Sequence, residues 1–305
     1  MRFGEVTLYP VNGHGPEDVV VDAEGRIYTG VDDGRILRLS PDGRHIDVIA
    51  DTGGRPLGLE LYGDDELLIC DARAGLLVVP LAGGSPSVLA TSALGLDFVF
   101  CNNAAVAADG TVYFTDSSRR FGIDNWRDDL IEQTAGGRLL RRAPDGSIDL
   151  LLDGLQFANG VALAPDESFV AVAETGACRV SRVWLSDGRS DVFADGLWGF
   201  PDNISTGTDG LIWITQASPR VAALDFARRL PGFLRAGIRR LPTSLQPSPG
   251  REVGVLGVAP DGRVVSELRG EIAGFHMLVG VREWRGQLYF GSLEESAIAV
   301  TPTIG

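Results

Sequence analysis

A unit of strand, turn and strand recurs six times along the 305-residue chain. In each copy, two runs of alternating apolar and polar residues flank a turn such as Ala-Glu-Gly or Pro-Asp-Gly, a pattern typical of a β-hairpin. Successive copies begin 41, 44, 57, 43 and 76 residues apart. The copies are EDVVVDAEGRIYTG from Glu17, GLELYGDDELLICD from Gly58, NNAAVAADGTVYFTD from Asn102, NGVALAPDESFVAVA from Asn159, DNISTGTDGLIWITQ from Asp202 and LVGVREWRGQLYFGS from Leu278.

Most copies continue into a second hairpin, as in GRILRLSPDGRHIDVIA after the first copy. Each unit therefore holds four strands. Four-stranded units repeated around an axis form a β-propeller, and its blades usually take about 40–50 residues. We predict an all-β, six-bladed β-propeller that forms a single domain over residues 1–305. The initial segment EVTLYP is expected to supply the outer strand of the last blade and so to close the ring.

Two insertions interrupt the repeats, at about 117–137 in the third blade and 217–250 in the fifth. The second insertion is the one stretch with helical spacing of apolar residues, and arginines lie between them. Pro231 falls inside it, so we expect two short helices rather than one. The excursion either packs on the propeller surface or forms a lid over one face.

The charge and composition exclude several classes of function. The chain carries 41 acidic residues against 27 basic ones, a formal net charge of −14, so binding to nucleic acid or to a membrane is not expected. All 27 basic residues are arginine, which excludes a Schiff-base or P-loop lysine. The three cysteines, the absence of an apolar leader and the absence of a long apolar run favour a soluble cytoplasmic protein.

Oxygen-bearing side chains recur at one position of the repeat. Aligning the copies on the strand after the turn and stepping back 11 residues reaches Asp, Glu or Asn in four of six copies. Equivalent positions of a propeller form a ring around its axis, so these side chains are expected to converge at one mouth of the channel. The aligned residues are Tyr28, Ile69, Tyr113, Val170, Trp213 and Tyr289, and the ring positions are Glu17, Gly58, Asn102, Asn159, Asp202 and Leu278.

Two carboxylates and two amides form a hard, all-oxygen donor set, which favours Ca²⁺ over zinc or copper, with Mg²⁺ ranked second. Asn203, which follows Asp202 directly, is a further candidate ligand or supports the ligands from behind. For any single position the alternative is an ordinary turn residue that starts a strand. The coincidence of four such positions favours a metal site.

Catalytic and substrate-binding candidates lie near this ring. Asp202 and Glu17 are candidates for the base or nucleophile, although binding to Ca²⁺ would lower their basicity. His14 and His276 lie just before ring positions and are alternative bases near neutral pH. Three aromatic residues precede the ring positions and are expected to line an apolar pocket, namely Phe157, Trp198 and Phe200.

The segments NGVALAPDESFVAVAET, PDNISTGTDGLIWIT, NNAAVAADGTVYFTDSS and LYFGSL resemble the strictosidine synthase-like branch of the six-bladed calcium propellers. The wider group includes gluconolactonase-like proteins, paraoxonases and diisopropylfluorophosphatase. The resemblance implies an axial Ca²⁺ held by residues at the positions of Glu17, Asn102, Asn159 and Asp202, with Asn203 added by similarity to paraoxonases. The catalytic glutamate of the plant synthase would fall near Val279, and Glu283 lies closer to the final strand. This departure favours hydrolysis over the synthase reaction.

The sequence therefore predicts a calcium-dependent hydrolase of small-molecule lactones or carboxylic esters, with phosphotriesters as candidate secondary substrates. In this prediction the metal polarises the substrate oxygen. Two alternatives stay open. One is a strictosidine synthase-like enzyme that forms carbon–nitrogen bonds or acts as a lyase. The other is a non-catalytic binding propeller with structural calcium.

Overall fold

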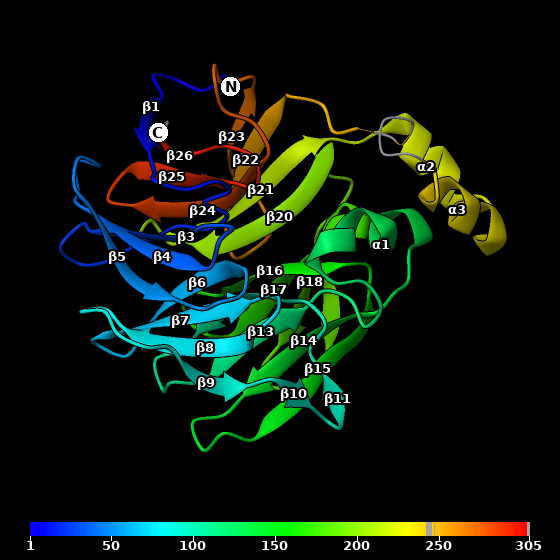
Figure 1. Cartoon of the computed structure of the whole chain (residues 1–305). Coiled ribbons are helices and arrows are strands. Elements are labelled where there is room, and N and C mark those ends of the chain that lie inside the picture. The colour runs from blue at the N-terminus through cyan, green and yellow to red at the C-terminus, as the bar shows by residue number, and fades with distance from the viewer. Residues whose placement is uncertain (242–245, 247, 304–305) are drawn as a thin grey trace.

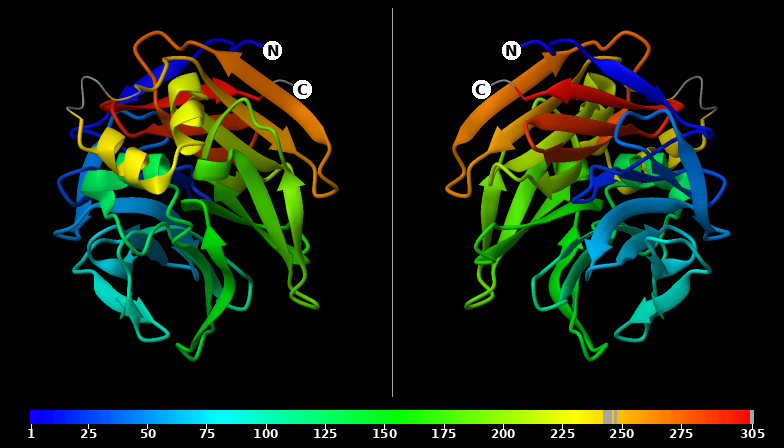
Figure 2. Two further views of the ribbon diagram at one scale, coloured as in Figure 1. Left: turned by 90° about the vertical axis from the view of Figure 1, so that its right-hand side faces the viewer. Right: turned by 90° about the vertical axis from the view of Figure 1, so that its left-hand side faces the viewer.

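Six four-stranded antiparallel sheets surround a central axis in the computed structural model, which describes residues 1–241, 246 and 248–303 (Figures 1 and 2). The predicted six-bladed propeller is confirmed. The first three blades comprise β2 (Val20–Val21), β3 (Ile27–Gly30), β4 (Arg35–Leu39) and β5 (Ile46–Asp51); β6 (Pro56–Tyr62), β7 (Glu66–Asp71), β8 (Gly75–Pro80) and β9 (Ser87–Ala90); and β12 (Cys101–Val106), β13 (Val112–Asp116), β14 (Gly137–Arg142) and β15 (Ile148–Leu155).

The remaining blades follow the same strand order. The fourth and fifth comprise β16 (Ala158–Leu163), β17 (Phe169–Glu174), β18 (Arg179–Trp184) and β19 (Ser190–Ala194); and β20 (Gly199–Thr206), β21 (Ile212–Pro219), β22 (Val253–Val258) and β23 (Val264–Gly270). The sixth blade takes β24 (Leu278–Trp284), β25 (Gln287–Ser292) and β26 (Ala297–Pro302) from the end of the chain. Its outer strand is β1 (Thr7–Pro10), which pairs with β26, so the ring closes as expected.

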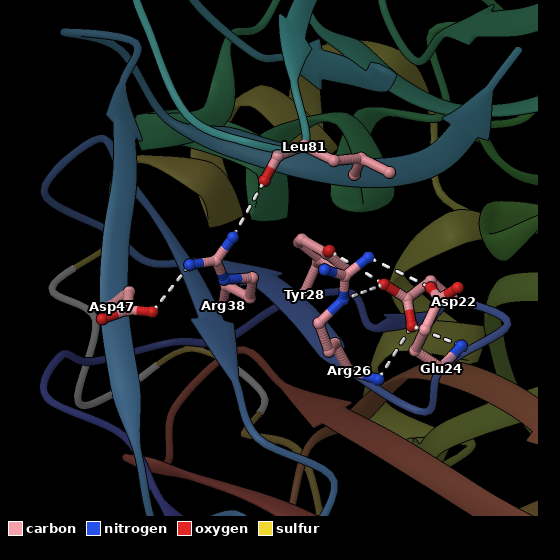
Figure 3. A network of polar contacts seen from close by, with 7 residues as sticks. All are labelled: Asp22, Glu24, Arg26, Tyr28, Arg38, Asp47 and Leu81. Atoms are coloured by element: carbon pink, nitrogen blue, oxygen red, sulfur yellow. Dashed lines mark hydrogen bonds and ion pairs between the residues drawn. The ribbon is translucent and has the colours of Figure 1, made fainter. Parts of the chain in front are cut away.

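In the first blade, charged side chains stabilise a hairpin turn and a contact with the neighbouring blade (Figure 3). Asp22 accepts hydrogen bonds from the backbone N–H groups of Glu24 and Arg26, and its other oxygen accepts from the Tyr28 hydroxyl at 2.9 Å. This arrangement is the local reason that an acidic residue begins such a turn. Arg38 binds Asp47 within the blade and the Leu81 carbonyl oxygen of the next blade, so it links the two sheets.

The hydrophobic core lies between neighbouring blades, because each sheet packs its apolar side chains against the sheets on either side of it. One cluster packs Tyr28 and Ile36 of the first blade against Leu59 and Ile69 of the second, and similar clusters fill other gaps between neighbouring blades. Trp213 is also fully buried in such a cluster. The aromatic residues of the repeat thus serve inter-blade packing.

Both insertions form helices on one face of the ring (Figures 1 and 2). The first holds a 3₁₀ turn, η1 (Ile123–Asn125), and α1 (Trp126–Glu132). The second holds α2 (Ala222–Arg228) and α3 (Gly232–Arg239), with Pro231 at the start of α3, so two short helices are present as expected. Residues 242–245 and 247 of this insertion lie outside the described residues. A small hairpin of β10 (Ser92–Ala93) and β11 (Leu96–Asp97) precedes the third blade. None of the helices in the described residues is long and apolar enough to cross a membrane.

Candidate metal centre and cavity

The candidate ligands lie where the inner strands bulge. In β12, Cys101 pairs with Asp116 and Ala104 with Phe114, so three steps on the inner strand oppose two on its partner. The same irregularity occurs in β6, β16, β20 and β24. A bulge turns consecutive side chains away from the regular alternation, and such bulges are common beside functional sites. The repeat thus presents one side chain per blade toward one hollow.

The first bulged residues and Glu17, which precedes β2, all line the same cavity: Glu17, Leu57, Asn102, Asn159, Asp202 and Val279. The predicted ring positions Gly58 and Leu278 are therefore wrong by one residue. The hairpin of the sixth blade is one residue shorter than that of the third, because Arg282 pairs with Tyr289 where Ala105 pairs with Tyr113. In the second blade, Leu68 rather than Ile69 is the equivalent of Tyr113. The ring has four oxygen-bearing and two apolar members.

The residue after each of these bulged residues belongs to a more tightly packed layer. In three blades this residue is a glycine, because the backbone of the neighbouring blade leaves no space for a side chain. A Cβ on Gly160 would lie 2.2 Å from the Ile204 nitrogen, and one on Gly280 would lie 2.5 Å from the Glu17 carbonyl oxygen. Asn203 and Asn103 share this layer. Asn103 is fully engaged, since its amide donates to Asp18 at 3.1 Å and its oxygen accepts from the Val161 N–H. It therefore supports the ring rather than offering a free oxygen.

The orientation of Asn102 is fixed by a hydroxyl group. Ser117 donates its proton to the Ala158 carbonyl oxygen at 2.6 Å, so its oxygen can only accept from the amide nitrogen of Asn102, at 2.8 Å. The amide oxygen of Asn102 is consequently turned the other way. That oxygen is buried and has no hydrogen-bond partner among the residues that the structure describes.

Asn159 is held in the same way one blade further on. Thr175, in the 3₁₀ turn η2 (Thr175–Ala177), donates to the Pro201 carbonyl oxygen at 2.7 Å and accepts from the Asn159 amide nitrogen at 3.2 Å. The Asn203 amide nitrogen donates to Glu17 at 3.1 Å. Within the described ranges, the amide oxygens of Asn159 and Asn203 are likewise buried without a partner. Buried polar atoms are nearly always paired, so three such oxygens fit a site for a cation.

The charges of Glu17, Asp18 and Asp202 act on one another, although in the described part of the chain these three carboxylates do not form a metal-binding group by themselves. Burial raises the pKa of Glu17 well above its ordinary value, and the charges of Asp202 and Asp18 raise it further, while Arg55 lowers it. Burial also raises the pKa of Asp202 to about 7, although the Asn159 amide lowers it. Burial raises the pKa of Asp18 to about 6, against the opposing charge of Arg282. Like charges in a buried site favour a bound cation, which would compensate them.

The donor set fits calcium. Glu17, Asn102, Asn159 and Asp202 line one cavity and offer carboxylate and amide oxygens. The amide nitrogen of Asn203 binds Glu17, and its amide oxygen has no partner among the described residues. Within the described part of the chain, no three His, Cys, Asp or Glu side chains gather as a metal-binding group, so a nitrogen or sulfur site of the zinc type is not formed there. Oxygen donors of this kind are those that Ca²⁺ prefers.

Above the ring, the cavity is apolar. Its space is about 900 Å³ when the open mouth is included, and the walls come from the blades and from both insertions. Phe157 and Phe200 line it as predicted, and Phe157 packs edge-on against Phe100 at 5.4 Å. Phe157 has φ 61°, which is unusual for a bulky residue and turns the chain into β16 just before Asn159. The roof residues from the insertions are Ile123, Trp126, Arg127, Leu130, Ile131, Val221 and Leu224.

Three predicted site residues lie outside this lining. Trp198 stacks on Arg269, with the guanidinium carbon 3.9 Å from the ring centroid, because Gly254 leaves space for the indole on the far side of the strand. His14 is exposed and pairs with Asp32 at 3.2 Å. His276 is held by Glu294 at 3.1 Å and by Glu295 through its two ring nitrogens. The predicted pocket role of Trp198 is wrong, and the geometry does not support either histidine as the base.

Two groups of residues were not predicted from the sequence. One is the pair of hydroxyl residues that orient the asparagines, and the other is the set of roof residues from the insertions. Ser117 and Thr175 follow the second strand of their hairpins, 15 and 16 residues after the asparagine that each one orients. A hydroxyl residue directly after the second strand of each of these two hairpins is a signal present in the sequence. The roof residues carry no such signal, because an apolar residue in a short helix is equally suited to ordinary packing.

Comparison with known proteins places the chain in one family. The family described as strictosidine synthase matches residues 102–188, and the one described as strictosidine synthase-like, N-terminal, matches residues 3–39. Protein strictosidine synthase-like 6 of Arabidopsis thaliana is 32% identical over 289 residues, which span 93% of this chain and 77% of that protein. Adipocyte plasma membrane-associated protein of Salmo salar is 35% identical over 243 residues, spanning 71% of this chain and 58% of that protein.

Solved structures show the same fold at low sequence identity. A gluconolactonase from Xanthomonas campestris has a TM-score of 0.71 at 18% identity and covers 99% of this chain and 91% of its own. Regucalcin from Agrobacterium tumefaciens, described as a calcium-binding protein, has a TM-score of 0.66 at 14% identity, covering 99% and 94%. By its sequence similarity and its propeller fold, the chain belongs to the strictosidine synthase-like family.

Proposed function

We propose that this protein is a calcium-dependent hydrolase of apolar lactones or carboxylic esters. The observation that carries the proposal is the set of buried, unpartnered amide oxygens beside two carboxylates at the floor of an apolar cavity. Glu17, Asn102, Asn159 and Asp202 would hold the ion, with Asn203 as an additional ligand. Bound calcium would polarise the substrate carbonyl and stabilise negative charge on its oxygen.

Asp202 is the better of the two carboxylates for proton transfer. Glu17 is 4% exposed and accepts a hydrogen bond from Asn203, whereas Asp202 is only partly buried and faces the cavity lining. In the proposed reaction a water oxygen attacks the carbonyl carbon while an Asp202 carboxylate oxygen takes the water proton. The carbon–oxygen bond of the ester then breaks, and Asp202 returns the proton to the leaving alkoxide.

The walls determine the substrate class. Most lining residues are apolar, among them Leu57, Phe100, Phe157, Phe200 and Leu224. Such walls contribute about 1.5–3 kcal/mol for each large apolar group that they bury, and they offer few partners for hydroxyl groups. We therefore expect substrates with alkyl or aryl bodies to be preferred over polyhydroxylated sugar lactones, which the gluconolactonase neighbour is named for.

The synthase alternative is disfavoured by the sixth ring position. Val279 lines the cavity where a carboxylate would be needed for acid catalysis in this blade. Glu283 lies at the other end of β24, where it accepts hydrogen bonds from Thr208 and from the Gly286 N–H. Neither residue can transfer a proton within the cavity. Hydrolysis is accordingly the function that the geometry supports best.

The test is a panel of lactones and aryl esters of increasing chain length, assayed with calcium and then with a chelator. Turnover should favour the longer substrates and disappear on chelation. Asp202→Asn keeps an oxygen donor but removes the proton acceptor, so kcat should fall about 10²–10⁴-fold with calcium still bound. Asp64→Asn, at an exposed turn, is the matched control and should leave kcat unchanged. Turnover that survives the chelator would contradict the proposal, and so would full activity in Asp202→Asn.

A further inference from the structure

A second groove lies between the two insertions. Residues after β13 and at the end of α1 form one wall, and the start of α3 forms the other, so the groove joins α1, which also lines the apolar cavity, to α3, which does not. The helices α1 and α3 lie beside each other (Figure 1). The lining residues are Arg119, Arg120, Glu132, Thr134, Ala135, Gly136, Gly232, Phe233, Arg235 and Ala236.

The charge of the groove is opposite to that of the molecule. Three of its lining residues are arginines and only Glu132 is acidic, in a chain whose net charge is −14. Glu132 is already neutralised, because one of its oxygens binds Arg120 at 2.5 Å and the other binds Arg239 at 2.6 Å. Arg119 uses one nitrogen to bind Asp153 at 2.7 Å. Since a guanidinium carries five N–H donors, most donors of Arg119 and Arg120 stay free.

Arg235 gives the clearest sign of a missing partner. No carboxylate of the residues that the structure describes lies within ion-pair distance of it, and its Nε is buried without a hydrogen-bond partner. An arginine that lines a groove and has no acidic partner is suited to bind an anion from outside the chain through its terminal nitrogens. Arg235, Arg119 and Arg120 line the same groove, and none of the residues that the structure describes accepts a hydrogen bond from the Arg235 guanidinium.

We propose that this groove binds a phosphate group, held between Arg235 on α3 and the Arg119–Arg120 pair. A planar guanidinium donates two parallel hydrogen bonds to a phosphate, and a tetrahedral oxyanion can accept such pairs from more than one side. The ring of Phe233, which is 75% exposed, borders the groove and would cover an apolar substituent of the ligand. A free phosphate monoester and an anionic lipid headgroup share this chemistry. Either one would tie α3 to the third-blade insertion.

The test uses phenyl phosphate in isothermal titration calorimetry, because this monoester carries both the anion and an aromatic group. We expect saturable binding at one site. Arg235→Gln should weaken it about tenfold or more, whereas Arg229→Gln, which changes an exposed arginine outside the groove, should stay within about twofold. Arg119→Gln is a second variant, expected to weaken binding at least threefold, and it decides the question if Arg235→Gln unfolds.

Vesicles distinguish the two sources of phosphate. If the ligand is a lipid headgroup, the protein should sediment with phosphatidic acid vesicles but not with phosphatidylcholine vesicles. The Arg235→Gln variant should then no longer sediment with phosphatidic acid vesicles. Saturable phenyl phosphate binding without vesicle binding would identify a free monoester. The proposal is overturned if neither probe binds saturably, or if Arg235→Gln and Arg229→Gln weaken binding equally, which would indicate diffuse attraction. Neither measurement depends on hydrolysis.

Discussion

Removing the Thr175 hydroxyl tests how the proposed calcium ligand Asn159 is oriented. Thr175→Val is nearly isosteric and deletes two hydrogen bonds, the one donated to the Pro201 carbonyl and the one accepted from Asn159. At about 1 kcal/mol each, their loss should lower the free energy of unfolding by about 2 kcal/mol. For a chain of 305 residues this corresponds to a fall in Tm of about 3 °C in calcium-free buffer.

The larger effect should be on calcium. Without the hydroxyl, the Asn159 amide loses the contact that turns its oxygen away from Thr175, and calcium affinity should fall about 10–100-fold. Calorimetric titration measures the affinity, and thermal unfolding with and without calcium measures the linked stabilisation. Thr175→Ser keeps the hydroxyl and should bind within about threefold of the parent. Parent-like affinity in a folded Thr175→Val protein would refute the orienting role.

Further variants probe the core, the cavity wall and the roof. Arg138→Met leaves the buried Asp116, bound at 2.6 Å, without its cation, so the free energy of unfolding measured by chemical denaturation should fall by about 3–5 kcal/mol. Arg141→Met breaks an exposed ion pair, and the free energy of unfolding should fall by less than about 1 kcal/mol. Equal losses in the two variants would contradict this prediction. Phe157→Ala should raise KM for octanoyl esters about tenfold or more while leaving acetate esters unchanged, and a uniform change would exclude a wall role. Replacing residues 222–241 by a short glycine–serine linker should alter chain-length preference in the ester panel while unfolding stays cooperative; loss of folding would show that the segment is structural.

The sequence was sufficient for the architecture because the repeat has two independent signals. Period-2 runs separated by acidic turns define hairpins, and their sixfold recurrence defines the ring. Register was predictable where the hairpins have equal length and the aligned residues are equivalent, as for Asn102 and Asp202. It failed for Leu278, because the turn of the sixth blade is one residue shorter, and for Gly58, because Leu68 rather than Ile69 is the equivalent of Tyr113.

The cavity walls were only partly predictable. Phe157 and Phe200 each lie two residues before a ring residue, Asn159 and Asp202 respectively, so their place in the repeat brings them to the cavity. Trp198 has a similar sequence position, yet it turns outward because Gly254 on the neighbouring strand makes room for the indole. The roof depends on contacts between α1 and the fifth-blade insertion, which are more than 90 residues apart in the chain. Such contacts leave no local pattern in the sequence.

We propose that oxygen donors from four blades hold calcium beneath the apolar cavity. The most direct measurement is anomalous scattering from crystals grown with calcium. One strong peak is predicted at the axis, 2.3–2.6 Å from the amide oxygens of Asn102 and Asn159 and from the carboxylates of Glu17 and Asp202. No peak there at millimolar calcium, or amide nitrogens turned toward the axis, would contradict the account.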